Sequence, residues 1–93
     1  MATDVSFYDM QNWFRAFKEV QSKAPAAYLT IQANEELPER ILSTSIYNTC
    51  ISLVVEDTDY FFTKEDVSSA VITDETVSVD TPYNNYTVKF NLK

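Results

Sequence analysis

The chain contains no glycine and no histidine, and it has a single cysteine, Cys50. Without glycine there is no glycine-rich phosphate loop and no dinucleotide-binding fingerprint. Without histidine, the commonest general base, the commonest metal ligand and every Ser-His or Cys-His nucleophile pair are excluded. One cysteine rules out an intramolecular disulfide. We therefore predict that the protein has no catalytic residues, is not an enzyme and uses no cofactor.

Long apolar runs and targeting segments are also missing. No apolar run approaches the roughly 20 residues of a membrane span, and the first ten residues, MATDVSFYDM, lack the basic flank and apolar stretch of a signal peptide. Because a lone cysteine is also typical of a reducing compartment, we expect a cytoplasmic protein with no membrane partner. If the protein is viral, that compartment is the cytoplasm of the host cell.

What is present suits a folded domain. Of the 93 residues, 45% are apolar and 14% are aromatic, which is enough to build a core without disulfides. A chain of this length holds one hydrophobic core, so residues 1–93 are predicted to form a single domain. Since glycine is absent, turn positions with a positive φ angle must fall to Asn and Asp, which gives the acidic residues a structural role.

The N-terminal segment predicts a helix over about residues 6–23. Large apolar residues recur there at spacings of three and four, as on one side of a helix. They are Phe7, Met10, Trp13, Phe14, Phe17 and Val20. Polar residues, Gln11 among them, occupy the rest of the circumference. Ser6 with Asp9 resembles a capping box, and Pro25 prevents the helix from continuing.

The remainder of the chain reads as strands. Runs of β-prone residues predict strands over about residues 27–32, 41–55, 59–63, 67–73, 76–80 and 86–92. The segment 41–55 is long for one strand, so it is either one bent strand or two strands that meet at residues 47–49. Its second half is apolar on both faces, as in a central strand. Residues 34–40 read as a polar connection.

These elements predict an α+β fold, with one N-terminal helix packed on a mostly antiparallel sheet of about five strands. Consecutive strands joined by short turns cannot be parallel neighbours, because parallel pairs need long crossover connections. The apolar stripe of the helix and one face of the last strand would form the core. That face carries Tyr86, Val88, Phe90 and Leu92.

The charge is unevenly distributed along the chain. The net charge is −7, and residues 56–80 alone carry eight acids against Lys64. Neither Asp57 and Asp59 nor Glu65 and Asp66 have the spacing of a calcium-binding loop, so no metal site is predicted. Two interpretations remain open. The acids either occupy the turns of a chain without glycine and keep it soluble, or form a negative face that engages a basic partner.

Strand alternation adds aromatic side chains to this acidic segment. Tyr60 and Phe62 share one face of a strand and Phe61 takes the other, so with one face in the core the other places at least one ring near the acids, where aromatic rings serve as binding anchors. Alternatively, both faces are buried, if the helix or another protomer covers the second one. We expect Glu56 to Asp59 and Lys64 to Asp66 to be turns that flank this strand. The predicted partner-binding residues are Asp57, Asp59, Tyr60, Phe61, Glu65, Asp66, Asp74 and Glu75.

No stretch of the sequence carries a family motif. In size, acidity and the lack of a catalytic set, the chain is similar to small phage-encoded antagonists of host enzymes, which include anti-CRISPR proteins and DNA mimics. That similarity implies an inhibitor that blocks a basic partner, such as a nuclease or another nucleic-acid-binding protein. Direct binding to nucleic acid is disfavoured, because a net charge of −7 repels a polyanion.

An alternative function remains open at this point. The protein could be a structural or assembly subunit, for example a virion component, whose acids only solubilise its turns. Exposed strand edges would then mediate docking, and both a monomer and a homodimer are compatible with the sequence.

Overall fold

The computed structural model describes residues 3–4 and 6–91, with one helix and nine strands in that part of the chain. The helix is α1 (Phe7–Lys23). The strands are β1 (Thr3–Asp4), β2 (Tyr28–Ala33), β3 (Glu39–Ile41), β4 (Ser43–Ile46), β5 (Cys50–Val54), β6 (Asp59–Thr63), β7 (Ser69–Ile72), β8 (Thr76–Asp80) and β9 (Asn85–Asn91). The α+β prediction, with an N-terminal helix on antiparallel sheet, is confirmed.

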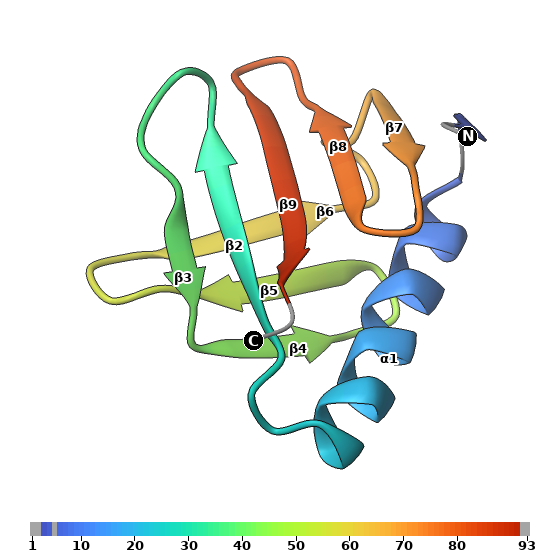
Figure 1. The fold of residues 1–93 in the computed structure, drawn as a ribbon. Coiled ribbons are helices and arrows are strands. Elements are labelled where there is room, and N and C mark those ends of the chain that lie inside the picture. The colour runs from blue at the N-terminus through green and yellow to red at the C-terminus, as the bar shows by residue number, and fades with distance from the viewer. Residues whose placement is uncertain (1–2, 5, 92–93) are drawn as a thin grey trace.

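The strands form two antiparallel sheets rather than one. A six-stranded sheet has the order β1-β7-β8-β9-β2-β3, and a three-stranded sheet has the order β4-β5-β6. In Figure 1 the two sheets lie face to face with their strands crossing, and α1 runs along one side of both. This arrangement resembles the orthogonal packing of two sheets, in which strands of the two layers run in very different directions.

The helix begins where the sequence indicates. Ser6 is the N-cap: its hydroxyl accepts a hydrogen bond from the backbone N–H of Asp9 at 3.4 Å, and the Asp9 carboxylate accepts one from the backbone N–H of Ser6. This reciprocal pair is the predicted capping box. Of the six stripe residues, four are buried, whereas Trp13 is half-buried and Val20 is 42% exposed. The core-facing stripe of α1 is therefore displaced away from Val20 relative to the sequence pattern.

Gln11 is the residue of α1 that the sequence pattern misplaces. It is only 4% exposed although it falls among the polar residues of the helix. Its side-chain amide donates hydrogen bonds to the backbone carbonyls of Tyr47 and Asn48, the latter at 3.3 Å. These two residues lie in the turn between β4 and β5, so Gln11 joins the helix to the three-stranded sheet and satisfies carbonyls that would otherwise lose their hydrogen bonds.

The long segment 41–55 contains two strands that meet at a turn, which is one of the two predicted alternatives. Strands β4 and β5 form a hairpin, with Ser43 opposite Val54 and Ile46 opposite Ile51, and residues 47–49 make the turn. Strand β5 lies between β4 and β6, which confirms the prediction of a central strand. The predicted polar connection 34–40 is partly wrong, because Glu39–Ile41 pairs with β2 as the edge strand β3.

The core lies between the two sheets and the helix. Both sheets and α1 contribute fully buried side chains, including Phe14, Leu29, Leu53, Phe62 and Val88. On β9, Val88 is buried as predicted, while Tyr86 and Phe90 are half-buried at the border of the core. Leu92, the fourth residue of that predicted face, lies outside the described residues.

Turn geometry contradicts the structural role expected for the acids. In the described part of the chain the only positive φ angle belongs to Asn34, at 53°. An asparagine takes that position, as the lack of glycine requires. No described Asp or Glu occupies such a position, so left-handed turn geometry does not explain why so many acids stand in the turns.

Candidate functional site

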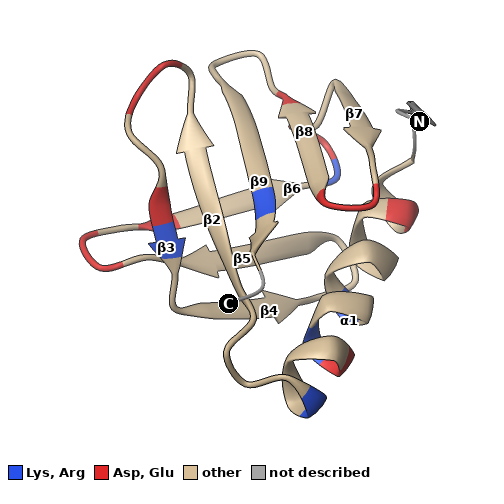
Figure 2. Cartoon of the chain, viewed as in Figure 1, with Lys and Arg blue, Asp and Glu red and all other residues tan. Residues whose placement is uncertain are grey.

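Acids from three segments of the chain gather at one end of the molecule, which we call the acidic end. They are Glu36, Glu39, Glu56, Asp57 and Asp59, and all are exposed. The connection from β2 to β3 supplies Glu36 and β3 supplies Glu39. The turn from β5 into β6 supplies Glu56 and Asp57, and Asp59 begins β6. In Figure 2 these segments are red along one edge of the fold, with the β2–β3 connection at the top and β3 and the β5–β6 turn below it.

A hollow lies between two of these segments. Its lining consists of Glu39, Arg40, Leu42, Glu56 and Asp57. Arg40 is the one cation in this lining, and its guanidinium lies 4.5 Å from the centre of the Tyr28 ring. Arg40 is thus held on β3 by a cation–π contact with β2. Three carboxylates in one lining leave an excess of negative charge around it.

The pKa of Tyr60 is affected by two acids of the acidic end. Partial burial, followed by the negative charges of Glu39 and Glu36 and by Tyr86, holds the pKa of the Tyr60 hydroxyl above its ordinary value. The carboxylates of the β2–β3 connection and of β3 therefore act on a side chain of β6. Tyr60 also packs edge-on against Tyr86, with ring centres 5.7 Å apart, which connects the three-stranded sheet to β9.

We expect the double variant E36Q/E39Q to lower the pKa of Tyr60 while leaving it above the ordinary value, because burial remains. A tyrosine whose pKa is raised by folding stabilises the protein below the unfolded-state pKa of about 10. That stabilisation is lost as the pH rises toward the folded-state pKa, and less of it is present in the variant. NMR titration of the Tyr60 ring gives the pKa directly. The matched variant E65Q/D66N should leave it unchanged, and an unchanged value in E36Q/E39Q would contradict the proximity of these groups.

The acidic segment 56–66 has the predicted order of turn, strand and turn. The backbone N–H of Val55 donates to the carbonyl of Thr58 at 3.0 Å, which closes the turn before β6. After β6, the backbone N–H of Asp66 donates to the carbonyl and the hydroxyl of Thr63, at 3.1 and 3.2 Å. Strand β6 pairs along its whole length with β5. Both turns are therefore anchored in sheet.

Neighbouring phenylalanines of β6 face opposite ways. Phe62 is 1% exposed and packs against Tyr86 with ring centres 5.2 Å apart, whereas Phe61 is 59% exposed. We expect Phe62→Ala to lower the free energy of unfolding by about 3–5 kcal/mol, because it leaves a cavity in the core. Phe61→Ala should change it by no more than about 0.5 kcal/mol, as for other exposed positions. Urea denaturation measures both, and similar losses would mean that Phe61 belongs to the core.

The structure does not bring all eight predicted partner-binding residues together. Asp57, Asp59 and Tyr60 lie at the acidic end, with Phe61 next along β6. Glu65 and Asp66 follow the other end of that strand, whose two ends, Asp59 and Thr63, are roughly 13 Å apart at about 3.3 Å per residue. The last two, Asp74 and Glu75, lie in the β7–β8 turn of the six-stranded sheet, near α1.

The list of predicted partner-binding residues also left out Glu36, Glu39 and Glu56, which belong to the acidic end. Glu56 is next to Asp57 in the sequence, so its place in the acidic end could have been predicted from the sequence. The other two come next to β6 only through the contact between the two sheets, and no local spacing encodes that contact. Whether any of these residues binds a partner remains a prediction.

The described residues contain neither a metal-binding cluster nor a helix that could span a membrane. No cluster of three or more His, Cys, Asp or Glu side chains in that part of the chain is arranged to hold a metal ion. The helix of the structure is too short and too polar to cross a bilayer. Cys50, on the central strand β5, is a half-buried free thiol.

Comparison with family models, with curated proteins and with solved structures finds no match to this chain.

Proposed function

We propose that the protein is a non-enzymatic inhibitor that covers a basic, nucleic-acid-binding surface of a partner protein, as a DNA mimic or an anti-CRISPR protein of a phage does. It acts in the cytoplasm, which is that of the host cell if the protein is viral. The observation that carries the proposal is the acidic end, where carboxylates from separate segments converge on one exposed surface. A basic groove on a partner is the complement of such a surface.

Exposed apolar side chains beside the acidic end support the same function. Leu37 is 86% exposed, Leu42 is 63% exposed and Phe61 is 59% exposed. Leu37 stands between Glu36 and Glu39 in the chain, and Leu42 lines the acidic hollow. Protein interfaces combine a few buried apolar or aromatic anchors with a charged rim. Carboxylates would steer the encounter, and these side chains would supply contact area once the partner is bound.

Rigidity of the surface favours tight association. Turn 55–58 and β6 are held by backbone hydrogen bonds on the β5 side, and Arg40 is held by Tyr28. Side chains presented by an ordered sheet lose less conformational entropy on binding than those of a mobile tail. The acidic end therefore suits a preformed docking surface rather than a segment that folds on its partner.

Affinity capture followed by competition tests the proposal. Tagged protein is used to capture partners from a lysate of the source cell, or of its host if the protein is viral. We expect a basic nuclease or another nucleic-acid-binding protein, whose binding to duplex DNA or RNA is lost when the inhibitor is added. A captured partner that still binds nucleic acid at full affinity would overturn the proposal. A stable closed oligomer in light scattering, with no partner captured, would instead favour an assembly subunit.

A further inference from the structure

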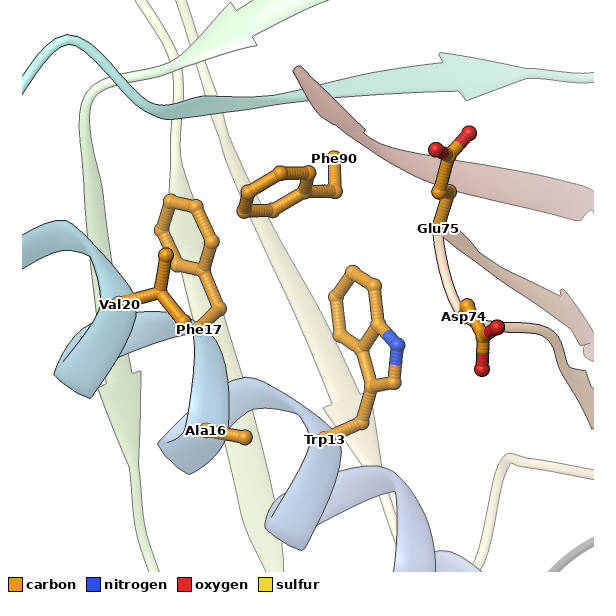
Figure 3. Close-up of a pocket in the computed structure, with 7 residues that line it drawn as sticks. All are labelled: Trp13, Ala16, Phe17, Val20, Asp74, Glu75 and Phe90. Carbon is orange, nitrogen blue, oxygen red and sulfur yellow. The ribbon is translucent and has the colours of Figure 1, made fainter. Parts of the chain in front are cut away.

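A second surface feature lies away from the acidic end. It is an apolar groove between α1, the β7–β8 turn and β9, which we call the aromatic groove. Its lining includes Trp13, Phe17, Val20, Asp74, Glu75 and Phe90, and its volume is about 260 Å³. Figure 3 shows three aromatic rings on one side of this space and the two acids on the other. Sites for drug-sized ligands begin at about 300 Å³, so this groove suits a single side chain.

The aromatic rings are fixed in place. Phe17 is only 6% exposed and meets Phe90 edge to face, with ring centres 5.6 Å apart. Trp13 meets Phe14 of the core in the same manner, at 5.1 Å. Both Trp13 and Phe90 are half-buried, so part of each ring remains open to solvent. The groove therefore has a rigid aromatic lining that a ligand can reach.

The two acids are held beside these rings by the backbone. The carbonyl of Glu75 accepts a hydrogen bond from the N–H of Phe90 at 2.7 Å, which fixes the β7–β8 turn against β9. Thr73 closes the turn: its hydroxyl accepts from the N–H of Glu75 at 3.3 Å and from that of Thr76 at 3.0 Å. Asp74 and Glu75 are exposed at the mouth of the groove.

We propose that the aromatic groove binds an arginine side chain of the partner protein. Aromatic faces attract a cation, and carboxylates at the mouth pair with it. Arginine fits this combination better than lysine, because its planar guanidinium stacks on rings, bonds carboxylates in a fork and carries a weaker hydration shell. Its methylene stem can pack against Val20. This inference rests on the proposed function in one respect, namely that the partner is basic.

The groove and the acidic end would contact different parts of the partner. They belong to different elements, since the groove uses α1, β9 and the β7–β8 turn while the acidic end uses β3, β6 and neighbouring connections. A cation captured in the groove would fix the orientation of a partner that the acidic end attracts. Asp74 and Glu75 were predicted as partner-binding residues, and the groove gives them a specific ligand.

The single tryptophan of the chain makes the test direct. N-acetyl-L-arginine amide is titrated into the protein, and the indole N–H signal of Trp13 is followed by NMR. We expect a saturable shift with a dissociation constant in the millimolar range, as for other ligands of this size. N-acetyl-L-citrulline amide has nearly the same shape without the charge and should give no saturable shift. The lysine analogue should bind more weakly than arginine.

Charge variants give the matched controls. D74N/E75Q should weaken arginine binding about threefold to tenfold, because two exposed ion pairs contribute modestly. E56Q/D57N removes the same charge at the acidic end and should leave the titration unchanged. Equal weakening by both variants, equal binding of arginine and citrulline, or no saturable shift would each overturn the inference. Tighter binding of lysine would reject the choice of arginine.

The titration needs only the purified protein, so its outcome is separate from that of the capture experiment. If arginine binds and no nucleic-acid-binding partner is blocked, the proposed function fails and the groove stands. If arginine does not bind while such a partner is captured and blocked, the groove inference fails and the proposed function stands.

Discussion

Phe17→Asp is expected to remove most of the stability of the protein and to lower its thermal midpoint steeply. Phe17 is 6% exposed, belongs to the hydrophobic core and contacts Phe90. Loss of a buried phenylalanine costs about 3–5 kcal/mol, and the new carboxylate must in addition be protonated or desolvated. A chain of 93 residues is expected to be stable by only about 5–14 kcal/mol, so the change removes most of that stability.

Circular dichroism and thermal denaturation measure this effect. Val20→Asp is the matched control, since Val20 is on the same helix and 42% exposed, and it should lower the midpoint only slightly. Helix propensity changes alike in both variants, so the difference between them isolates burial. If the Phe17→Asp protein melts cooperatively near the midpoint of the parent, the assignment of this face of α1 to the core is wrong.

Neutralising the acidic end is expected to slow association with a captured basic partner at least about tenfold. E56Q/D57N/D59N removes three charges from the acidic end without changing the size of a side chain. Electrostatic steering accelerates association by about 10 to 10³ at low ionic strength, and most of that gain would disappear. The rate of the variant should also depend less on salt than that of the parent.

Surface plasmon resonance at several salt concentrations gives both quantities. The control E19Q/E65Q/D66N removes the same number of charges from positions away from the acidic end, and all three are exposed. We expect it to slow association much less. Equal slowing would show that net charge, rather than its convergence at one end, attracts the partner. An unchanged association rate in both variants would show that electrostatic steering does not contribute to binding of the partner.

Much of the fold could be predicted because it depends on local patterns. The helix follows from apolar spacing and from the Ser6–Asp9 capping box, and the strands follow from β-prone runs. Where the pattern failed, a distant contact was responsible. Gln11 is polar yet buried, since it bonds carbonyls of the β4–β5 turn. The β3 strand exists only because Glu39–Ile41 pairs with β2.

The candidate site was less predictable for the same reason. Sequence order groups Asp57 with Glu65 and Asp66, but β6 separates them in space. Conversely, Glu36 and Glu39 come close to Tyr60 only through the packing of one sheet on the other. Strand alternation, a local property, separated Phe61 from Tyr60 and Phe62 correctly, but only the structure shows that Phe61 is on the exposed face. The sequence also predicted that the helix stripe with Trp13 packs on the strand face with Phe90, but it did not predict that the β7–β8 turn leaves an open groove beside these two rings.

The sheet order has a consequence for how the chain folds. Strand β9, the last of the described strands, lies between β8 and β2, and the hydrogen bond from Asn91 to Thr30 spans 61 residues. The β4–β5–β6 meander needs no partner beyond residue 63 and can form from neighbouring segments. The six-stranded sheet, in contrast, must close a long loop before β2 gains its central neighbour, which is a slow step. We therefore expect folding in milliseconds to seconds, with the meander formed first and the docking of β9 limiting the rate.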